Sequence, residues 1–174
     1  MTWAVWITGL PGSGKSTIAL ALQKAVPDSV LLNMDSVRQI ITPAPTYSEV
    51  EREMVYRAVV FTAQLLYELG HNVIIDATGN RRMWRELAAK KIANFFEIYL
   101  KTPLALCIQR ESSRLDTHRA PRGIYSKGEM GAPVPGLNVP YEEPLNPSLV
   151  FDTQALSPEA ICGEIVSFLR QSGR

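Results

Sequence analysis

Apolar residues follow two alternating patterns along the chain. Short, almost continuous apolar runs predict five strands, at 3–8, 30–33, 73–76, 95–100 and 149–151. Between these runs, apolar residues recur every three or four positions and predict helices at 16–25, 49–69, 81–93, from 104 onward, and at 158–169. Strands this apolar, alternating with helices, are typical of a mostly parallel sheet that helices cover on both faces. The pattern therefore predicts an α/β fold with three α/β/α layers.

One segment departs from this pattern. Residues 116–147 hold six of the twelve prolines and few residues that could form a core. A long stretch without regular structure inside a compact domain is commonly either a functional lid or disordered. Its basic residues Arg119, Arg122 and Lys127 and its tyrosines Tyr125 and Tyr141 favour a lid.

The composition excludes several classes of protein for this chain. A chain of 174 residues, 46% of them hydrophobic, is large enough for one ordinary core, so we expect 1–174 to form a single domain. A net charge of +1 argues against a nucleic-acid coat or a polybasic membrane binder, because both neutralise many phosphates at once. No stretch approaches the ~18–20 apolar residues of a membrane span, and we expect a cytoplasmic protein. Cys107 and Cys162 lie far apart without metal-ligand spacing, which predicts reduced core residues.

A glycine-rich segment carries the clearest chemical signal. The sequence Gly9-Leu10-Pro11-Gly12-Ser13-Gly14-Lys15-Ser16 fits G-x-x-x-x-G-K-[ST], directly after a predicted strand and at the head of a predicted helix. Its glycines let backbone N–H groups converge on phosphate oxygens at a helix N-terminus. In this interpretation Lys15 neutralises the β- and γ-phosphates, Ser16 offers a hydroxyl to Mg²⁺, and Thr17 contacts the α-phosphate. The segment predicts a P-loop nucleoside triphosphatase fold.

The use of the triphosphate is a separate question. The chain lacks an Asn-Lys-x-Asp guanine signature, which disfavours a regulatory GTPase. A small domain with a proline-rich, basic late segment instead favours a kinase that closes a lid over two substrates.

Asp35 and Arg38 follow the second predicted strand, three positions apart. Ligands of parallel α/β sheets bind at the carboxyl ends of the strands, so this pair is expected to face the phosphate loop. There Asp35 could deprotonate an acceptor hydroxyl and Arg38 could hold an anionic group. The alternative is a helix-capping Asp with a surface salt bridge to Arg38.

Three further candidates have structural alternatives of similar weight. Arg52 lies in the first turn of a predicted helix, where a cation is disfavoured, so either a carboxylate (Glu49 or Glu51) balances it or it reaches an anionic ligand. Asp76 ends a buried strand and either holds Mg²⁺-bound water or orients the acceptor, or it caps the next helix. Arg110 or Arg114 could touch the nucleotide, or both lie on a solvated helix face.

Several segments resemble the adenylylsulfate kinase family over nearly the whole chain. Arg122-Gly123-Ile124-Tyr125-Ser126-Lys127 resembles the family's Lys-Gly-Leu-Tyr-Lys-Lys. The segment 140–147 and Val150-Phe151-Asp152-Thr153 are similar to its Pro-Tyr-Glu-x-Pro-x-Asn-Pro and its strand ending in Asp-Thr. Asp35-x-x-Arg38 matches part of the family's Asp-Gly-Asp-Asn-Val-Arg, and Tyr47-Ser48-x-x-x-Arg52 matches its Phe-Ser-x-x-x-Arg.

The resemblance implies a function and site roles. It implies an ATP- and Mg²⁺-dependent kinase that phosphorylates the 3′-hydroxyl of adenylylsulfate. Asp35 is then the base, Arg38 and Arg52 hold adenylylsulfate, and Lys127 belongs to the lid. Apart from the resemblance, Asp76 is also an expected substrate-binding residue because of its place at the end of a buried strand. Arg110 and the loop residues Gly9, Gly12, Ser13, Gly14, Lys15, Ser16 and Thr17 are the expected nucleotide contacts. As partners we expect a small-molecule substrate, no stable nucleic acid and no membrane; a homodimer is left open.

The sequence departs from the family on the acceptor side. Asn33 and Met34 replace the first Asp and Gly of Asp-Gly-Asp-Asn, and the segment 76–80 replaces Ser-Phe-Ile-Ser-Pro, so no phosphoserine role carries over. The segment 133–136 has lost the aromatic of the lid's Gly-Phe-Thr-Gly. Asp76-Ala77-Thr78 is more similar to polynucleotide-kinase-like enzymes. A kinase for another hydroxyl acceptor and a non-catalytic nucleotide-binding module are therefore the alternatives.

Overall fold

The computed structural model describes residues 1–113 and 121–172. A five-stranded sheet lies at its centre, with every neighbouring pair of strands parallel and the order β2-β3-β1-β4-β5. The strands are β1 (Ala4–Thr8), β2 (Ser29–Asn33), β3 (Asn72–Asp76), β4 (Phe95–Lys101) and β5 (Leu149–Asp152). All five predicted strands are confirmed to within one residue at each end, and the sheet is wholly rather than mostly parallel.

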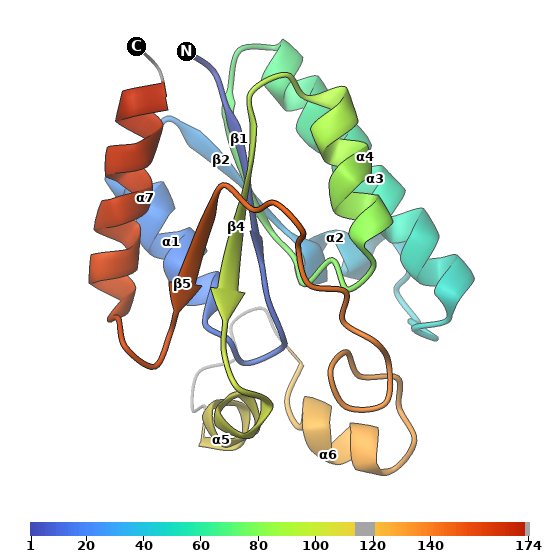
Figure 1. Ribbon diagram of the computed structural model, residues 1–174. Helices are drawn as coiled ribbons and strands as arrows, with labels where there is room; N and C mark the ends of the chain where they lie inside the picture. Colours follow the sequence, from blue (N-terminus) through green and yellow to red (C-terminus); the bar gives the residue numbers. More distant parts are fainter. Residues whose placement is uncertain (114–120, 173–174) are drawn as a thin grey trace.

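The helices form the two outer layers and a cap (Figure 1). They are α1 (Lys15–Ala25), α2 (Met34–Ile41), α3 (Glu49–Glu68), α4 (Arg82–Lys91), α5 (Leu104–Ser113), α6 (Ile124–Glu129) and α7 (Pro158–Ser172). α1 and α7 cover one face of the sheet, α3 and α4 cover the other, and α5 and α6 lie beyond the carboxyl end of β4. The predicted three-layer arrangement is confirmed.

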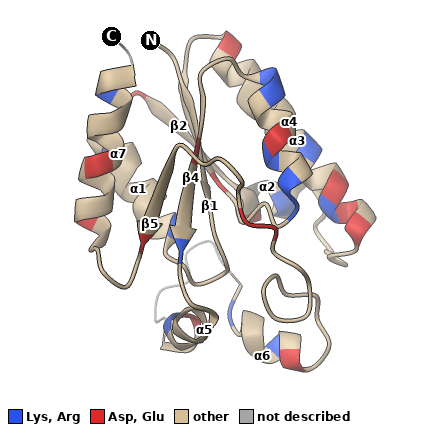
Figure 2. Cartoon of the chain, viewed as in Figure 1, with Lys and Arg blue, Asp and Glu red and all other residues tan. Residues whose placement is uncertain are grey.

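Side chains that alternate along the strands pack into two separate hydrophobic cores, one on each face of the sheet. On β1, Val5 and Ile7 pack with α1 and α7, whereas Ala4 and Trp6 pack with α3 and α4. Because successive strand residues point to opposite faces, one apolar run such as 4–8 serves both cores. Charged residues of both signs lie along α3 and α4 (Figure 2).

The expectation of an irregular lid is wrong in part. Helix α6 lies inside the proline-rich segment, and its Tyr125 forms a third small core with Val134 and Cys107 of α5. The Leu137 side chain lies very close to α6 at Gly128, since a Cβ on Gly128 would lie 2.7 Å from Leu137 Cδ2. Helix α2 was also not predicted; Asn33 caps it by accepting a hydrogen bond from the Ser36 backbone N–H at 3.0 Å. Residues 114–120, with the candidates Arg114 and Arg119, lie outside the described part.

Cys107 and Cys162 are both buried free thiols, as predicted. Within 1–113 and 121–172, no helix is long and apolar enough to cross a membrane.

Candidate active site

The phosphate loop joins β1 to α1 in a conformation that depends on glycine. Gly12 and Gly14 have φ values of 81° and 99°, and Gly14 is the residue that precedes α1. A Cβ on Gly12 would also collide with the backbone of Cys107, so the loop lies directly against α5. Lys15 Nζ donates to the Leu10 carbonyl at 2.9 Å, which holds the ammonium group over the loop. The motif requires a strand before the loop and a helix after it, and the structure has both, β1 and α1.

A cavity of about 390 Å³ opens in front of this loop. Gly12, Gly14, Lys15, Ser16 and Thr17 line one end of it, whereas Gly9 and Ser13 are buried within the loop. The structure also brings six further candidates to the cavity, from five elements: Asp35, Arg38, Arg52, Asp76, Arg110 and Lys127. One cavity thus joins the triphosphate end and the expected acceptor end.

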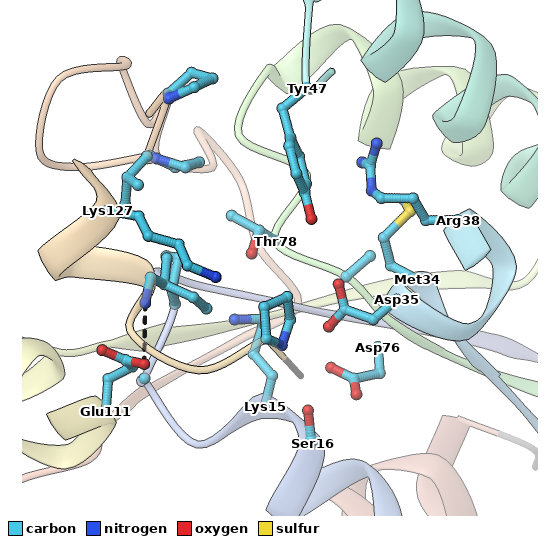
Figure 3. A pocket seen from close by; sticks show the side chains of 18 of the residues that line it. Lys15, Ser16, Met34, Asp35, Arg38, Tyr47, Asp76, Thr78, Glu111 and Lys127 are labelled. Atoms are coloured by element: carbon cyan, nitrogen blue, oxygen red, sulfur yellow. Dashed lines mark hydrogen bonds between the residues drawn. The ribbon is translucent and has the colours of Figure 1, made fainter. Parts of the chain in front are cut away.

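Two carboxylates lie beside the phosphate loop in this cavity. Asp35 of α2 and Asp76 of β3 are neighbours, close to Lys15 and Ser16 (Figure 3). Asp76 is buried, and its Oδ2 accepts a hydrogen bond from Asn33 Nδ2 at 2.8 Å. Helix-capping interpretations are wrong for both, because Asn33 precedes α2 and Arg81 precedes α4. Both carboxylates therefore belong to the wall of the cavity and cap no helix.

Arg38 and Glu51 form a buried ion pair at the acceptor end. Arg38 Nη1 lies 2.6 Å from Glu51 Oε1, and each side chain is 9% exposed. The surface salt bridge between Asp35 and Arg38 that the alternative expected is therefore replaced by a buried bond between α2 and α3. The Arg38 guanidinium also lies 4.9 Å from the centre of the Tyr47 ring, which makes a cation–π contact. Arg38 and Tyr47 form one wall of the cavity.

Glu51 also fixes the backbone that carries Tyr47. Its Oε2 accepts hydrogen bonds from Thr46 N, from Thr46 Oγ1 at 2.7 Å and from Tyr47 N at 3.1 Å. Tyr47 has a φ of 56°, an uncommon conformation for a bulky residue that the surrounding bonds hold in place. Burial alone would raise the pKa of Glu51, but the Thr46 and Tyr47 hydrogen bonds and the Arg38 charge outweigh it and lower the pKa below its ordinary value.

Among the described residues Arg52 forms no ion pair with Glu49 or Glu51, and its contact with an anionic ligand stays a prediction. It is buried at the cavity wall, and it donates to three uncharged oxygens: the Tyr47 carbonyl at 2.9 Å, Asn80 Oδ1 at 3.2 Å and the Pro133 carbonyl at 2.7 Å. Glu51, which could have balanced its charge, pairs with Arg38 instead. Arg52 therefore joins α3 to the loop after β3 and to the lid.

Among the described residues, Lys127, Glu111 and Arg110 are the charged side chains on the lid side of the cavity. Lys127 of α6 extends into the cavity opposite Asp35 (Figure 3). Glu111 of α5 is buried and accepts a hydrogen bond from the Ile124 backbone N–H at 3.1 Å, which fixes the start of α6. Arg110 lines the cavity and donates to Thr153 Oγ1 and to the Thr153 carbonyl at 2.9 and 2.7 Å. Its guanidinium thereby ties α5 to the end of β5.

Sequence reasoning did not assign site roles to several residues of the acceptor end. Tyr56 lines the cavity, stacks on Trp84 with ring centres 4.1 Å apart, and accepts a hydrogen bond from the Gly79 N–H at 2.8 Å. Burial raises the pKa of Tyr56, so it stays a neutral phenol. Glu51 and Asn80 act through partners 13 and 28 residues away in the chain, at Arg38 and Arg52. The only signal for Glu51 was an acid beside Arg52, and for Asn80 its place in the segment that departs from the family.

Comparison with known proteins shows which family the chain resembles. A family model described as "Adenylylsulphate kinase" matches residues 1–152. A probable adenylyl-sulfate kinase of Archaeoglobus fulgidus is 38% identical over 159 residues, which are 88% of this chain and 97% of that protein. The adenylyl-sulfate kinase of Pseudomonas aeruginosa is 33% identical over 175 residues, covering 95% and 84% of the two chains.

A solved structure shares the fold over almost its full length. The APS kinase of Mycobacterium tuberculosis, solved in complex with AMPPNP and APS, superposes with a TM-score of 0.85 and 29% sequence identity. The superposition covers 97% of this chain and 98% of that one.

Proposed function

The chain belongs to the adenylylsulphate kinase family, and from that premise we propose that it transfers the γ-phosphoryl group of ATP to the 3′-hydroxyl of adenylylsulfate. One observation carries the proposal. A single cavity has the phosphate loop with Lys15 at one end and Asp35, Arg38 and Lys127 around the other. Phosphoryl transfer asks a protein mainly for positioning and electrostatic stabilisation, and this cavity offers both.

The nucleotide occupies the phosphate-loop end in this proposal. Members of the family use ATP, and Lys15 balances the charge that develops on its transferred phosphoryl group. The Ser16 hydroxyl and the Asp76 carboxylate provide oxygen ligands of the kind that suit Mg²⁺, beside the place where the phosphates would lie. These two residues would hold the ion, directly or through water, and a bound Mg²⁺ would supply further neutralisation of phosphate charge.

The acceptor occupies the opposite end. Asp35 accepts or directs the proton of the attacking hydroxyl, since it lies between the phosphate loop and the Arg38–Tyr47 wall (Figure 3). Arg38 and Lys127 provide positive charge for the anionic groups of adenylylsulfate. The Tyr47 ring offers a flat surface beside them.

The test is a coupled assay of ADP release with three arms: adenylylsulfate, an oligonucleotide with a 5′-hydroxyl end, and no acceptor. Acceleration by adenylylsulfate alone, with 3′-phosphoadenylylsulfate as the product, supports the proposal. Acceleration by the oligonucleotide alone would instead favour a kinase for another hydroxyl acceptor, the class that the Asp76-Ala77-Thr78 segment resembles. Binding of ATP without transfer in any arm would favour a non-catalytic module.

A homodimer is part of this proposal. Helix α3 exposes apolar side chains four or seven positions apart, at Val50, Met54, Phe61 and Leu65, and exposed apolar patches are typical of interfaces. Light scattering coupled to size exclusion is expected to give twice the mass of the chain, and a monomer for Phe61→Ser. A monomeric wild-type protein would contradict the dimer without affecting the proposed reaction.

A further inference from the structure

The lid contains a compact loop, residues 133–140, that is braced from within. Asn138 Oδ1 accepts a hydrogen bond from the Val134 N–H at 2.7 Å, and its Nδ2 donates to the Gly128 and Ala132 carbonyls at 3.0 and 2.8 Å. The Gly136 N–H donates to the Val139 carbonyl at 2.8 Å. These bonds brace the loop as one compact unit. We call residues 133–140 the lid loop.

Both ends of the lid loop are tied to the body of the protein by two buried side chains. Arg52 Nη2 donates to the Pro133 carbonyl, at the start of the loop, at 2.7 Å. Asn80 Nδ2 donates to the Pro140 carbonyl, at its end, at 3.1 Å. Arg52 Nη1 and Asn80 Oδ1 are themselves joined at 3.2 Å. The four groups form one continuous chain of hydrogen bonds across the base of the loop.

The tip of the lid loop lies against the phosphate loop. Gly136 has a φ of 85°, and a Cβ there would lie 2.5 Å from Leu10 Cδ2. Pro133, Val134 and Pro135 line the same cavity as Lys15 and Asp35. The bonds at the base of the loop therefore set how its apolar residues cover the acceptor end and how its tip meets the phosphate loop.

We propose that Arg52 and Asn80 are positioning residues that act together as a latch, and that Arg52 contributes to the reaction by holding the lid loop in place. Three of the five N–H donors of Arg52 go to uncharged oxygens, a pattern that uses the planar fork of the guanidinium. The kinetic consequences rest on the proposed function. The structural consequence, the order of the lid loop, does not.

The decisive variant is Arg52→Lys, because lysine keeps the charge and loses the fork. If the latch is correct, amide hydrogen exchange in 133–142 of the substrate-free enzyme is about tenfold faster in Arg52→Lys and in Asn80→Ala than in the wild type. Arg57→Lys is the matched control, since Arg57 lies on the same helix and makes an exposed ion pair with Glu53. Wild-type exchange in Arg52→Lys would overturn the proposal, whatever the acceptor proves to be.

Asn80→Asp separates the two halves of the latch. Aspartate keeps an oxygen for Arg52 but loses the donor to Pro140, so faster exchange is expected around 139–142 and unchanged exchange around 132–134. In a double-mutant cycle, Arg52→Lys with Asn80→Ala is expected to be no worse than the more severe single variant, because both break one chain of bonds. Fully additive effects would overturn the joint action of the two residues.

Steady-state kinetics of the same variants measures how the latch affects the reaction. Both Arg52→Lys and Asn80→Ala are expected to raise the KM for adenylylsulfate about tenfold and to raise ATP hydrolysis without acceptor, because a loosened lid admits water. A higher KM in Arg52→Lys with the lid loop as protected as in the wild type would instead place Arg52 on the acceptor and reject the latch. If adenylylsulfate is not the acceptor, the proposed reaction fails and the exchange result still decides on the latch.

Discussion

The two ends of the cavity are constructed differently. The phosphate end is one continuous segment, 9–16, whose shape comes from glycines and whose position comes from the strand before it and the helix after it. The acceptor end is assembled from α2, α3, β3 and the lid, and side-chain bonds hold its parts together. One hydrogen bond of Lys15 reaches five residues back, to Leu10, whereas one hydrogen bond of Arg52 reaches 81 residues ahead, to Pro133.

This difference predicts two kinds of response to substitution. A change at the phosphate end removes one interaction with the transferring group and leaves the surrounding structure intact. A change at the acceptor end also releases a partner, so that binding, lid order and stability change together. The two ends are therefore distinguished by measuring rate and stability in the same variants.

The largest effect is expected at Lys15. Lys15→Ala removes the positive charge beside the transferred phosphoryl group and should lower kcat about 10³-fold, without a change in the thermal melting temperature. Steady-state turnover and calorimetry measure the two quantities, and Lys90→Ala on the exposed face of α4 is the control. Normal turnover in Lys15→Ala would contradict the proposed mechanism.

Asp35 gives the next largest effect. Asp35→Asn keeps the shape of the side chain but cannot accept a proton, so kcat should fall about 10²-fold while the KM for ATP stays near that of the wild type. Asp28→Asn, at an exposed position before β2, is the matched control. If the variant loses ATP affinity and keeps its rate, Asp35 acts at the phosphate end and not at the acceptor end.

The phosphate end could be predicted from sequence because its information is local. Gly12, Gly14 and Lys15 act within one motif, and a buried strand and an amphipathic helix on either side fix its position. The same locality explains the five strands, whose apolar runs specify burial directly.

The acceptor end could be predicted only in outline. Asp35, Arg38 and Asp76 were placed correctly at the carboxyl edge of the sheet, because topology brings the ends of parallel strands together. The partners of Arg38 and Arg52 could not be deduced, since Glu51 and Asn80 meet them through tertiary packing. Helix α6 was missed for the same reason: Tyr125 and Val134 form a core only when the lid folds against Cys107.

Glu51 tests the acceptor end through stability. Glu51→Gln removes the charge opposite Arg38 and weakens the bonds to Thr46 and Tyr47, so the KM for adenylylsulfate should rise about tenfold and the free energy of unfolding should fall by about 2 kcal/mol. Steady-state kinetics and urea unfolding measure these effects. Glu53→Gln, at a half-buried position on the same helix, is the control.

The pH dependence of this effect has a definite sign. The pKa of Glu51 in the folded protein lies below its ordinary value of 4.5, so its stabilising contribution is fully present above pH 4.5 and is lost as the pH falls through the folded pKa. The difference in unfolding free energy between wild type and Glu51→Gln should therefore shrink as the pH is lowered from 5 toward 3. A difference independent of pH over this range would show that the charge of Glu51 does not contribute.

The smallest effect is expected at the Tyr47 hydroxyl. The contacts of Tyr47 described above use its ring, which lies against Arg38, and its backbone, which Glu51 and Arg52 hold, so Tyr47→Phe should change kcat and KM by less than about twofold. Tyr47→Gly suits the positive φ but removes the ring, and should raise the KM for adenylylsulfate about tenfold. A large loss in the Phe variant would mean that the hydroxyl itself contacts the acceptor. The acceptor end would then depend on a single group, as the phosphate end does on Lys15.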